Sequence, residues 1–237
     1  MKKILVSFFL LLSLASAQAR NVFLVSVGIA DYPGAVNDLF LPADDATAIY
    51  RLYVNHAGAK AVLLRDSSAT RSEVLSSMRR LFSQAQEDDI VIFFFSGHGV
   101  RSGFVAYDEF LTYSDLKSVF SSCRARNKMI FADACYSGGL RDGRAHGSRD
   151  GLNQIMLFLS SRDNEVSIES PFMDNGFFTT ALLGALKGGA DFNRDRVITA
   201  IELFKAVSSK VSSLSFDSQH PVMWGSFPDN MPVMDWR

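Results

Sequence analysis

Five short runs of almost uninterrupted apolar residues constrain the fold of this chain more than any other feature. A strand with one face in water alternates apolar and polar residues, whereas a strand buried on both faces is apolar throughout. Three of the five runs contain no polar residue, and each of the other two contains a single one. The runs therefore predict strands of a sheet that is covered on both sides: Val22–Ile29, Ala61–Leu64, Ile90–Phe95, Lys128–Ala132 and Ile155–Leu159.

The segments between these strands favour helices. After Pro42, apolar residues from Ala46 to Tyr53 recur at helical spacing, and proline is well tolerated in the first turn of a helix. Three further helices are expected, at Ser72–Gln86, Phe177–Leu186 and Thr199–Val211. Strands that alternate with helices form a mostly parallel sheet, because each helix returns the chain to the same edge. We therefore expect an α/β fold, a mostly parallel sheet with helices on both faces.

Length, composition and charge limit the number of domains and the kinds of partner that this chain can have. Its 237 residues are 48% hydrophobic and 21% charged, which is enough apolar material for one substantial core. No internal repeat or long linker interrupts the sequence. The formal net charge is −1, so no global field attracts nucleic acid or an anionic membrane. We therefore expect no nucleic-acid partner, and any charged partner must be selected locally.

The first nineteen residues have the three regions of a secretory signal peptide. Two lysines follow the first methionine, an apolar run extends from Ile4 to Leu14, and Ala-Gln-Ala ends at position 19. The apolar run is too short to cross a bilayer comfortably, so no stable membrane insertion is expected after its removal. The alternative is an N-terminal strand or helix of the fold. We expect residues 1–19 to be a signal peptide and residues 20–237 to form one periplasmic or secreted domain.

Two polar, glycine-rich loops directly follow two of the buried strands. The sequence SGHG occupies positions 96–99 after the strand at 90–95, and DACYSGG occupies positions 133–139 after the strand at 128–132. Ligands of open parallel sheets bind outside the carboxyl ends of the strands. The two loops are therefore expected at the same edge of the sheet, although 37 residues separate His98 from Cys135.

His98 and Cys135 together suggest nucleophilic catalysis. A thiol needs a base or a positive neighbour to become a good nucleophile at neutral pH, and an imidazole supplies either. The glycines after Cys135 suit a turn whose amide N–H groups face a developing oxyanion, and Gly97 and Gly99 are further candidate donors. Taken singly, each residue has a simpler interpretation, a histidine in a tight turn and a small buried hydrophobe.

The chain has only two cysteines, Cys123 and Cys135. In an exported protein, such a pair raises the possibility of a disulfide. A bridge between them would block Cys135, so we interpret Cys123 as a core or surface thiol. Their number and spacing do not suggest a zinc site, which needs about four ligands in tight pairs.

The loop sequences resemble a known family. FFFSGHG and FADACYSGG are similar to the histidine and cysteine motifs of the caspase-like clan, nearest to the bacterial metacaspase-like members of peptidase family C14. VSVGIADYPG, LPADDATAIYRL and GFFTTALLGALKGGADFNRDRVITAIEL resemble the family's first strand and loop, its first helix, and its C-terminal helices. The resemblance implies a three-layer caspase-hemoglobinase-like fold. It also implies cysteine endopeptidase activity through a Cys–His dyad without an obligatory cofactor.

The same resemblance implies protein or peptide substrates that are cut after arginine or lysine. The positions that match the family's specificity pocket are Asp133, Asp45 and Ser96. A carboxylate at the bottom of a pocket binds a guanidinium through two hydrogen bonds, which gives the preference a physical reason. For Asp45, an acid favoured by the dipole at a helix N-terminus is the alternative. The chain departs from the family pattern at Asp44, which replaces asparagine, and the short interval after His98 leaves little room for the hairpin that often follows it.

A possible calcium loop precedes the last helix. Counted from Asp191, oxygen-bearing side chains fall at positions that match ligands of an EF-hand. The candidate ligands are Asp191, Asn193, Asp195 and Glu202. Arg196 stands where an EF-hand has glycine, so a polar turn that caps the last helix is the alternative. Calcium is the only metal that the sequence suggests.

Three functional hypotheses remain open at this point. The leading one is an endopeptidase, and the others are a caspase-like binding or signalling module with little activity and a calcium-binding structural protein. The polar loop 141–150 contains Arg141, Arg144 and Arg149 among glycines. An enzyme that cleaves after basic residues would meet these arginines at high effective concentration, so self-processing is one hypothesis for this loop. A solvated basic loop that is not processed is the alternative.

Overall fold

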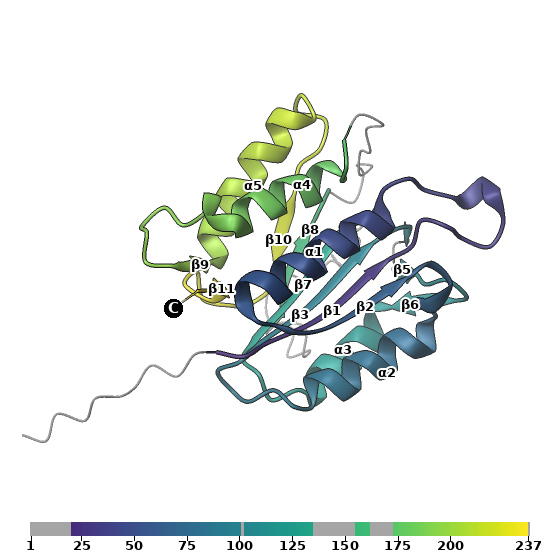
Figure 1. Cartoon of the computed structure of the whole chain (residues 1–237), viewed down its shortest axis with the longest axis horizontal. Helices are drawn as coiled ribbons and strands as arrows, with labels where there is room; N and C mark the ends of the chain where they lie inside the picture. Colours follow the sequence, from purple (N-terminus) through teal and green to yellow (C-terminus); the bar gives the residue numbers. More distant parts are fainter. Residues whose placement is uncertain (1–19, 101, 135–154, 162–172, 237) are drawn as a thin grey trace, which may run out of the picture.

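A six-stranded sheet forms the centre of the computed structural model (Figure 1), which describes residues 20–100, 102–134, 155–161 and 173–236. Its spatial order is β10-β8-β7-β3-β1-β2. The neighbouring strands from β2 to β8 are parallel, and β10 pairs antiparallel with β8 at the edge. The strands are β1 (Val22–Gly28), β2 (Lys60–Arg65), β3 (Ile90–Ser96), β7 (Asn127–Asp133), β8 (Ile155–Leu159) and β10 (Val222–Trp224). The expected mostly parallel sheet is confirmed.

Helices cover both faces of this sheet, so the molecule has the three layers expected (Figure 1). One face packs against α1 (Pro42–Ala57), α4 (Phe177–Gly184) and α5 (Ala200–Leu214). The opposite face packs against α2 (Arg71–Phe82) and α3 (Tyr113–Ser122). All residues of β1 and β3 are buried, which is why each of these strands is apolar apart from a single serine.

Alternation along β3 assigns its side chains to the two cores. Ile92 and Phe94 belong to the core under α1, α4 and α5, whereas Phe93 and Phe95 belong to the core under α2 and α3. Ser96, the last residue of the strand, continues the alternation on the α1 side, where its hydroxyl contacts Asp45. The sequence of β3 therefore places a polar side chain against α1 at the carboxyl edge of the sheet.

The segment after His98 contains a hairpin, for which the sequence was expected to leave little room. β4 (Gly99–Val100), β5 (Gly103–Val105) and β6 (Phe110–Thr112) form a three-stranded antiparallel sheet. The expectation that the interval is too short for a hairpin was wrong, because strands of two and three residues suffice. α3 follows β6 directly and returns the chain to the start of β7.

Smaller elements complete the described part of the chain. β9 (Val197–Thr199) and β11 (Pro232–Asp235) form an antiparallel pair beside α5, and a short 3-10 turn spans Ala35–Asn37. A π-helical turn extends α4 over Ala185–Gly189. None of the described helices has the length and apolarity needed to span a membrane.

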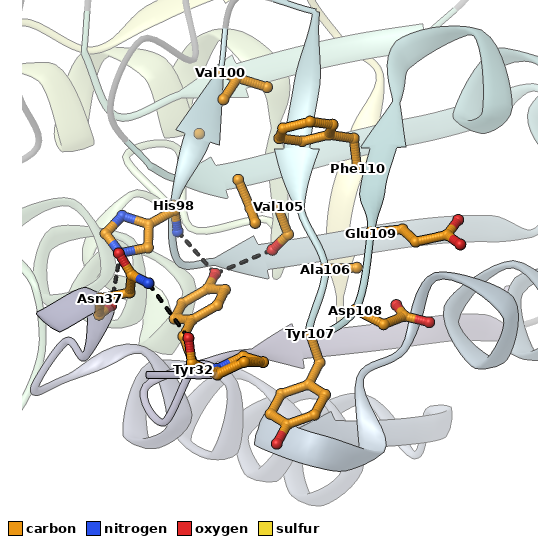
Figure 2. A pocket seen from close by; sticks show the side chains of 12 residues that line it. Tyr32, Asn37, His98, Val100, Val105, Ala106, Tyr107, Asp108, Glu109 and Phe110 are labelled. Atoms are coloured by element: carbon orange, nitrogen blue, oxygen red, sulfur yellow. Dashed lines mark hydrogen bonds between the residues drawn. The ribbon is translucent and has the colours of Figure 1, made fainter. Parts of the chain in front are cut away.

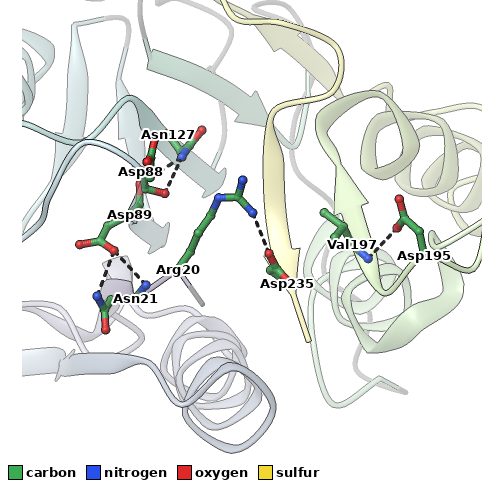
Figure 3. A network of polar contacts seen from close by, with 8 residues as sticks. All are labelled: Arg20, Asn21, Asp88, Asp89, Asn127, Asp195, Val197 and Asp235. Atoms are coloured by element: carbon green, nitrogen blue, oxygen red, sulfur yellow. Dashed lines mark hydrogen bonds and ion pairs between the residues drawn. The ribbon is translucent and has the colours of Figure 1, made fainter. Parts of the chain in front are cut away.

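A polar network fastens the chain at the amino edge of the sheet (Figure 3). Arg20 donates from Nη1 to Asp235 Oδ2 at 2.8 Å, which joins the residues before β1 to β11. The backbone N–H and the side-chain amide of Asn21 donate to Asp89 Oδ1 at 2.9 and 3.0 Å. This end of the sheet is therefore closed by hydrogen bonds, and the polar loops lie at the other end.

Candidate active site

The carboxyl edge of the sheet brings together loops that are far apart in the sequence. In the register of the sheet, Gly28 of β1 is paired with Ser96 of β3, and Ser96 is paired with Asp133 of β7. These three residues end their strands in one row. The peptide that follows Ser96 carries His98, and the peptide that follows Asp133 leads towards Cys135. Both loops therefore start at the same edge of the sheet, as expected, and the second loop is described up to Ala134.

The imidazole of His98 is oriented by a main-chain oxygen. Its Nε2 lies 2.8 Å from the carbonyl oxygen of Asn37, in the turn between β1 and α1. A carbonyl oxygen can only accept a hydrogen bond, so Nε2 carries the proton and Nδ1 keeps its lone pair. The sequence analysis missed Asn37, and it could not have found it, because every residue type has this carbonyl group.

Tyr32 is a second residue that the sequence analysis missed. Its hydroxyl accepts a hydrogen bond from the backbone N–H of His98 at 3.0 Å and donates one to the carbonyl oxygen of Val105 at 3.0 Å. Its ring centroid lies 4.8 Å from that of the imidazole. Burial raises the pKa of Tyr32 well above its usual value, so the hydroxyl stays protonated and keeps both bonds.

Gly97 is required by the backbone and by this tyrosine. Its φ of 151° is rarely adopted by residues with a side chain, and a Cβ there would lie 2.6 Å from the Tyr32 hydroxyl. Its N–H donates to the carbonyl oxygen of Asp133 at 3.2 Å. The Gly97 N–H therefore already joins the loop after β3 to the end of β7, and this bond does not support the expected role of Gly97 as an oxyanion donor. Gly99 lines the cavity beside His98 and stays a candidate donor.

The three residues expected in the specificity pocket lie together under α1 and α4. Asp45 is 1% exposed and Asp133 is 6% exposed. Asp45 Oδ2 accepts a hydrogen bond from the hydroxyl of Ser96 at 2.8 Å. Its Oδ1 accepts from the side-chain amide of Asn175 at 2.9 Å and from the backbone N–H of Gly176 at 3.1 Å. Asp45 is thus a buried group of the site, although it also stands in the first turn of α1.

Asp133 is held by the N-terminus of α4. Its Oδ2 accepts hydrogen bonds from the backbone N–H and the hydroxyl of Thr179, at 3.1 and 2.9 Å. The partial positive charge of a helix N-terminus stabilises such a carboxylate. A Cβ at Gly176 would lie 2.6 Å from Asp133 Oδ2 and 3.4 Å from Asp45 Oδ2. A side chain at position 176 would therefore collide with Asp133 and touch Asp45, so the close packing of the two carboxylates requires glycine there.

The proximity of two acids changes the protonation of Asp45. Burial, followed by the negative charge of Asp133, raises the pKa of Asp45 from 3.8 to about 8, against the opposing effect of its three hydrogen bonds. Asp45 is therefore largely protonated at pH 7, whereas Asp133 carries the negative charge that helps to keep it so.

Cys135 lies outside the described residues, as does the loop 141–150. Ala134, which precedes it, is buried, and its N–H donates to the hydroxyl of Ser160 at 3.2 Å. Cys123 is a buried free thiol at the end of α3, with Sγ 3.4 Å from the carbonyl oxygen of Phe82. Burial raises its pKa, as is typical of an unreactive thiol. The interpretation of Cys123 as a core residue agrees with this environment.

The candidate calcium ligands are engaged with the chain itself. Asp191 accepts hydrogen bonds from the backbone N–H groups of Asp195 and Arg196, both at 3.1 Å. Asn193 Oδ1 accepts from the Asp195 N–H at 2.9 Å, and Glu202 forms the capping box at the start of α5. Within the described residues, no group of three or more His, Cys, Asp or Glu side chains is arranged to hold a metal ion. The geometry gives the calcium hypothesis no support, and it stays a prediction.

An open cavity of about 850 Å³ lies beside His98 on the side of α2 and α3 (Figure 2). The imidazole and the ring of Tyr32 stand at one end, and the segment from Val105 to Phe110 forms the other wall. The acid pair is on the opposite face of the sheet, because Ser96 directs its side chain to α1. His98 thus stands at the sheet edge between the buried pair of carboxylates and an open cavity.

Comparisons with known proteins agree with this architecture. The sequence model of the caspase domain, peptidase family C14, matches residues 23–231. The crystal structure of protein GSU0716 from Geobacter sulfurreducens is similar, with a TM-score of 0.70 over 91% of this chain and 98% of that chain. It is 17% identical in sequence, which supports the fold alone. No curated protein matches the sequence significantly. The family match extends over nearly the whole described domain, and the chain belongs to the caspase-domain family of cysteine peptidases, peptidase C14.

Proposed function

We propose that this protein is a cysteine endopeptidase with Cys135 as nucleophile and His98 as general base and acid, and that it cuts after arginine or lysine. One observation carries the proposal. At a single edge of the sheet, an imidazole with its Nδ1 lone pair available stands beside a buried pair of carboxylates. Family membership supports the class of reaction.

The proposed reaction begins with proton transfer from Cys135 to Nδ1 of His98. The thiolate attacks the carbonyl carbon of the scissile bond, and the imidazolium is stabilised by the Asn37 carbonyl oxygen bonded to Nε2–H. His98 then gives the proton from Nδ1 to the leaving amine as the C–N bond breaks. Water, with its proton taken by the same nitrogen, hydrolyses the thioester and releases the thiol.

The proposed basis of specificity is the acid pair. A substrate guanidinium or ammonium group enters beside Asp45 and Asp133, and its positive charge lowers the pKa of Asp45 so that both carboxylates are ionised. Ser96 and Thr179 keep the carboxylate oxygens oriented. An acidic residue before the cut is rejected, because its negative charge would be desolvated beside that of Asp133.

Hydrolysis of short peptides by the protein beginning at Arg20 tests the proposal. Fluorogenic peptides that end in arginine or lysine should be cleaved, and a matched peptide that ends in aspartate should not. Cys135→Ala and His98→Ala should each lose activity by several orders of magnitude, because nucleophile and base act as a unit. Cys123→Ser is the matched control and should keep full activity. Preference for the aspartate peptide would contradict the assigned specificity, and an active Cys135→Ala variant would contradict the nucleophile.

Two further proposals concern the export and the proteolytic processing of the protein. Export to the periplasm or the medium, with loss of residues 1–19, follows from the signal-peptide pattern at its start. Self-processing after one of Arg141, Arg144 or Arg149 follows from the basic loop and the proposed specificity. Sequencing the N-termini of purified wild-type protein and of Cys135→Ala tests both. Loss of residues 1–19 should occur in each, whereas a cut in the loop should occur only in the wild type.

A further inference from the structure

The three-stranded sheet β4–β6 has one face in the core and one face on the open cavity. Phe104 and Leu111 are fully buried in the core under α2 and α3. Because side chains alternate along a strand, their neighbours Val105 and Phe110 lie on the other face, although Val105 is half-buried and still contacts this core. These two residues are directly paired in the register and line the cavity beside His98 (Figure 2). The cavity therefore has an apolar wall, to which Val100 of β4 also contributes.

This wall is hydrogen-bonded to the backbone of the catalytic histidine. The N–H of Val105 donates to the carbonyl oxygen of His98 at 2.9 Å. The carbonyl oxygen of Val105 accepts from the Tyr32 hydroxyl, which in turn accepts from the His98 N–H. The imidazole and the apolar wall are thus parts of one hydrogen-bonded unit, and their relative position is well defined.

The part of the substrate that occupies the cavity can be inferred from the position of the general acid in the proposed reaction. A general acid must reach the leaving nitrogen, so the first residue after the cut lies against the imidazole. The side chain before the cut enters the acid pair on the α1 side, so the chain after the cut continues towards α2 and α3. We propose that the cavity is the subsite for the first residue of the leaving fragment, and that it selects a large apolar side chain. This inference rests on the proposed function.

The size and charge of the cavity fit this occupant. A volume of about 850 Å³ accommodates a leucine or phenylalanine side chain with space for the following residue. Phe110 is 60% exposed, so a ligand side chain can cover it. Asp108 and Glu109 are exposed at the outer end, and no lysine or arginine lines the cavity among the residues described there. An acidic side chain is therefore disfavoured, although Arg71, whose N–H bonds Asp108 Oδ1 at 2.8 Å, reduces the effect at this end.

Matched peptides separate this subsite from the rest of the reaction. Internally quenched peptides with arginine before the cut would carry leucine, glycine or glutamate after it, in an otherwise identical sequence. The corresponding arginine methyl ester tests the nucleophile and the acid pair alone, because methanol is too small to use the cavity. Each substrate is measured with the wild type, with Phe110→Ala and with Phe192→Ala. Phe192 is also 60% exposed but lies in the turn before β9, so its variant is a matched control.

We expect the wild type to cleave the leucine peptide about tenfold more efficiently than the glycine peptide in kcat/KM, with glutamate the slowest. Phe110→Ala should lose most of the preference for leucine and keep full ester hydrolysis, which also shows that it folds. Phe192→Ala should match the wild type on all substrates. Equal rates for leucine and glycine, or an unchanged preference in Phe110→Ala, overturn the subsite and leave the peptidase intact. A wild type that hydrolyses neither peptides nor ester overturns the proposed function and the subsite with it.

Discussion

At the residue scale, two important contacts of the site involve a backbone carbonyl oxygen and a glycine, and neither can be recognised from a pattern of side chains in the sequence. The imidazole of His98 is oriented by the carbonyl oxygen of Asn37, and Gly176 is required because two carboxylates approach the point where a Cβ would stand. Sequence patterns correctly bring His98, Asp45, Ser96 and Asp133 to one edge, because each of these acts through its side chain at the end of a strand or the start of a helix. The position of the Asn37 carbonyl oxygen and the close contacts of Gly176 depend on how distant segments pack, so they cannot be predicted from the sequence pattern.

Substitution of Gly176 should therefore remove the specificity pocket without unfolding the protein. In Gly176→Ala, the methyl group would lie 2.6 Å from Asp133 Oδ2, in the space proposed for the guanidinium. We expect kcat/KM for arginine peptides to fall at least a hundredfold, because one of two desolvated ion pairs is lost or displaced. Gly184→Ala, in the same helix, is the matched control, since no atom lies within 4 Å of its Cβ position. Equal activity of the two variants would place the substrate elsewhere.

The raised pKa of Asp45 predicts the pH dependence of stability. The folded state binds a proton on Asp45 up to about pH 8, whereas the unfolded chain releases it near pH 3.8. The stabilisation from this proton is complete below the unfolded pKa and is lost as the pH rises towards 8, so the free energy of unfolding should fall over this range. Asp45→Asn should flatten the decline.

Urea unfolding at several pH values, in the Cys135→Ala background to prevent cleavage, measures this contribution. The informative quantity is the difference in unfolding free energy between the parent and Asp45→Asn as the pH increases. A difference that is independent of pH between 4 and 8 would show that Asp45 is ionised throughout. An arginine-ended peptide inhibitor should reduce the decline in the parent, because the cation favours the ionised form.

At the element scale, the predictable parts are the ones that are buried on both faces. β1, β3, β7 and β8 were found from solid apolar runs, and their bounds differ from the expected ones by at most one residue. The strands β4, β5, β6, β9, β10 and β11 and the helix α3 were missed. Strands of two to four residues are too short to show a period, and α3 has only three buried residues in ten. Their positions depend on partners that are distant in sequence.

The helix α1 is placed by its contact with the end of β1. A Cβ at Gly28 would lie 2.0 Å from the carbonyl oxygen of Pro42 and 2.7 Å from the Ala46 Cβ, so the helix rests directly on the glycine. In Gly28→Ala the start of α1 must move away from the sheet, and Asp45 moves with it. We expect a loss of about 1–3 kcal/mol in unfolding free energy. Hydrolysis of the arginine peptides and of the arginine methyl ester should both slow, because both substrates place a guanidinium at the acid pair.

Thermal unfolding and parallel kinetics of Gly28→Ala check this prediction. Gly184→Ala again serves as the control and should be at least as stable as the wild type, because alanine is the better helix former. A Gly28→Ala protein with unchanged melting temperature would mean that α1 accommodates the methyl group, and the close contact would then not determine where the helix lies.

At the scale of the whole molecule, the proposed self-processing should not separate the two parts of the chain. The loop 141–150 joins β7 and β8 in sequence, and these strands pair directly in the middle of the sheet. After a cut, the two segments would still share a buried sheet and two cores. We expect cleaved wild-type protein to run as two bands in a denaturing gel and as one species in size-exclusion chromatography, at the elution volume of Cys135→Ala. Separate elution of the segments would contradict this.

The row formed by Gly28, Ser96 and Asp133 has a consequence for how this protein can change during evolution. The position of each residue in this row depends on the register of its strand. A shift of the register by one residue turns every side chain of the strand to the other face of the sheet. Single insertions or deletions within β1, β3 or β7 should therefore abolish the site, whereas apolar substitutions inside the same strands should be tolerated. In a library of one-residue insertions, variants with an insertion inside any of these three strands should be inactive. Apolar substitutions at the same positions should leave activity. We therefore expect the lengths of these strands to tolerate less change than their sequences.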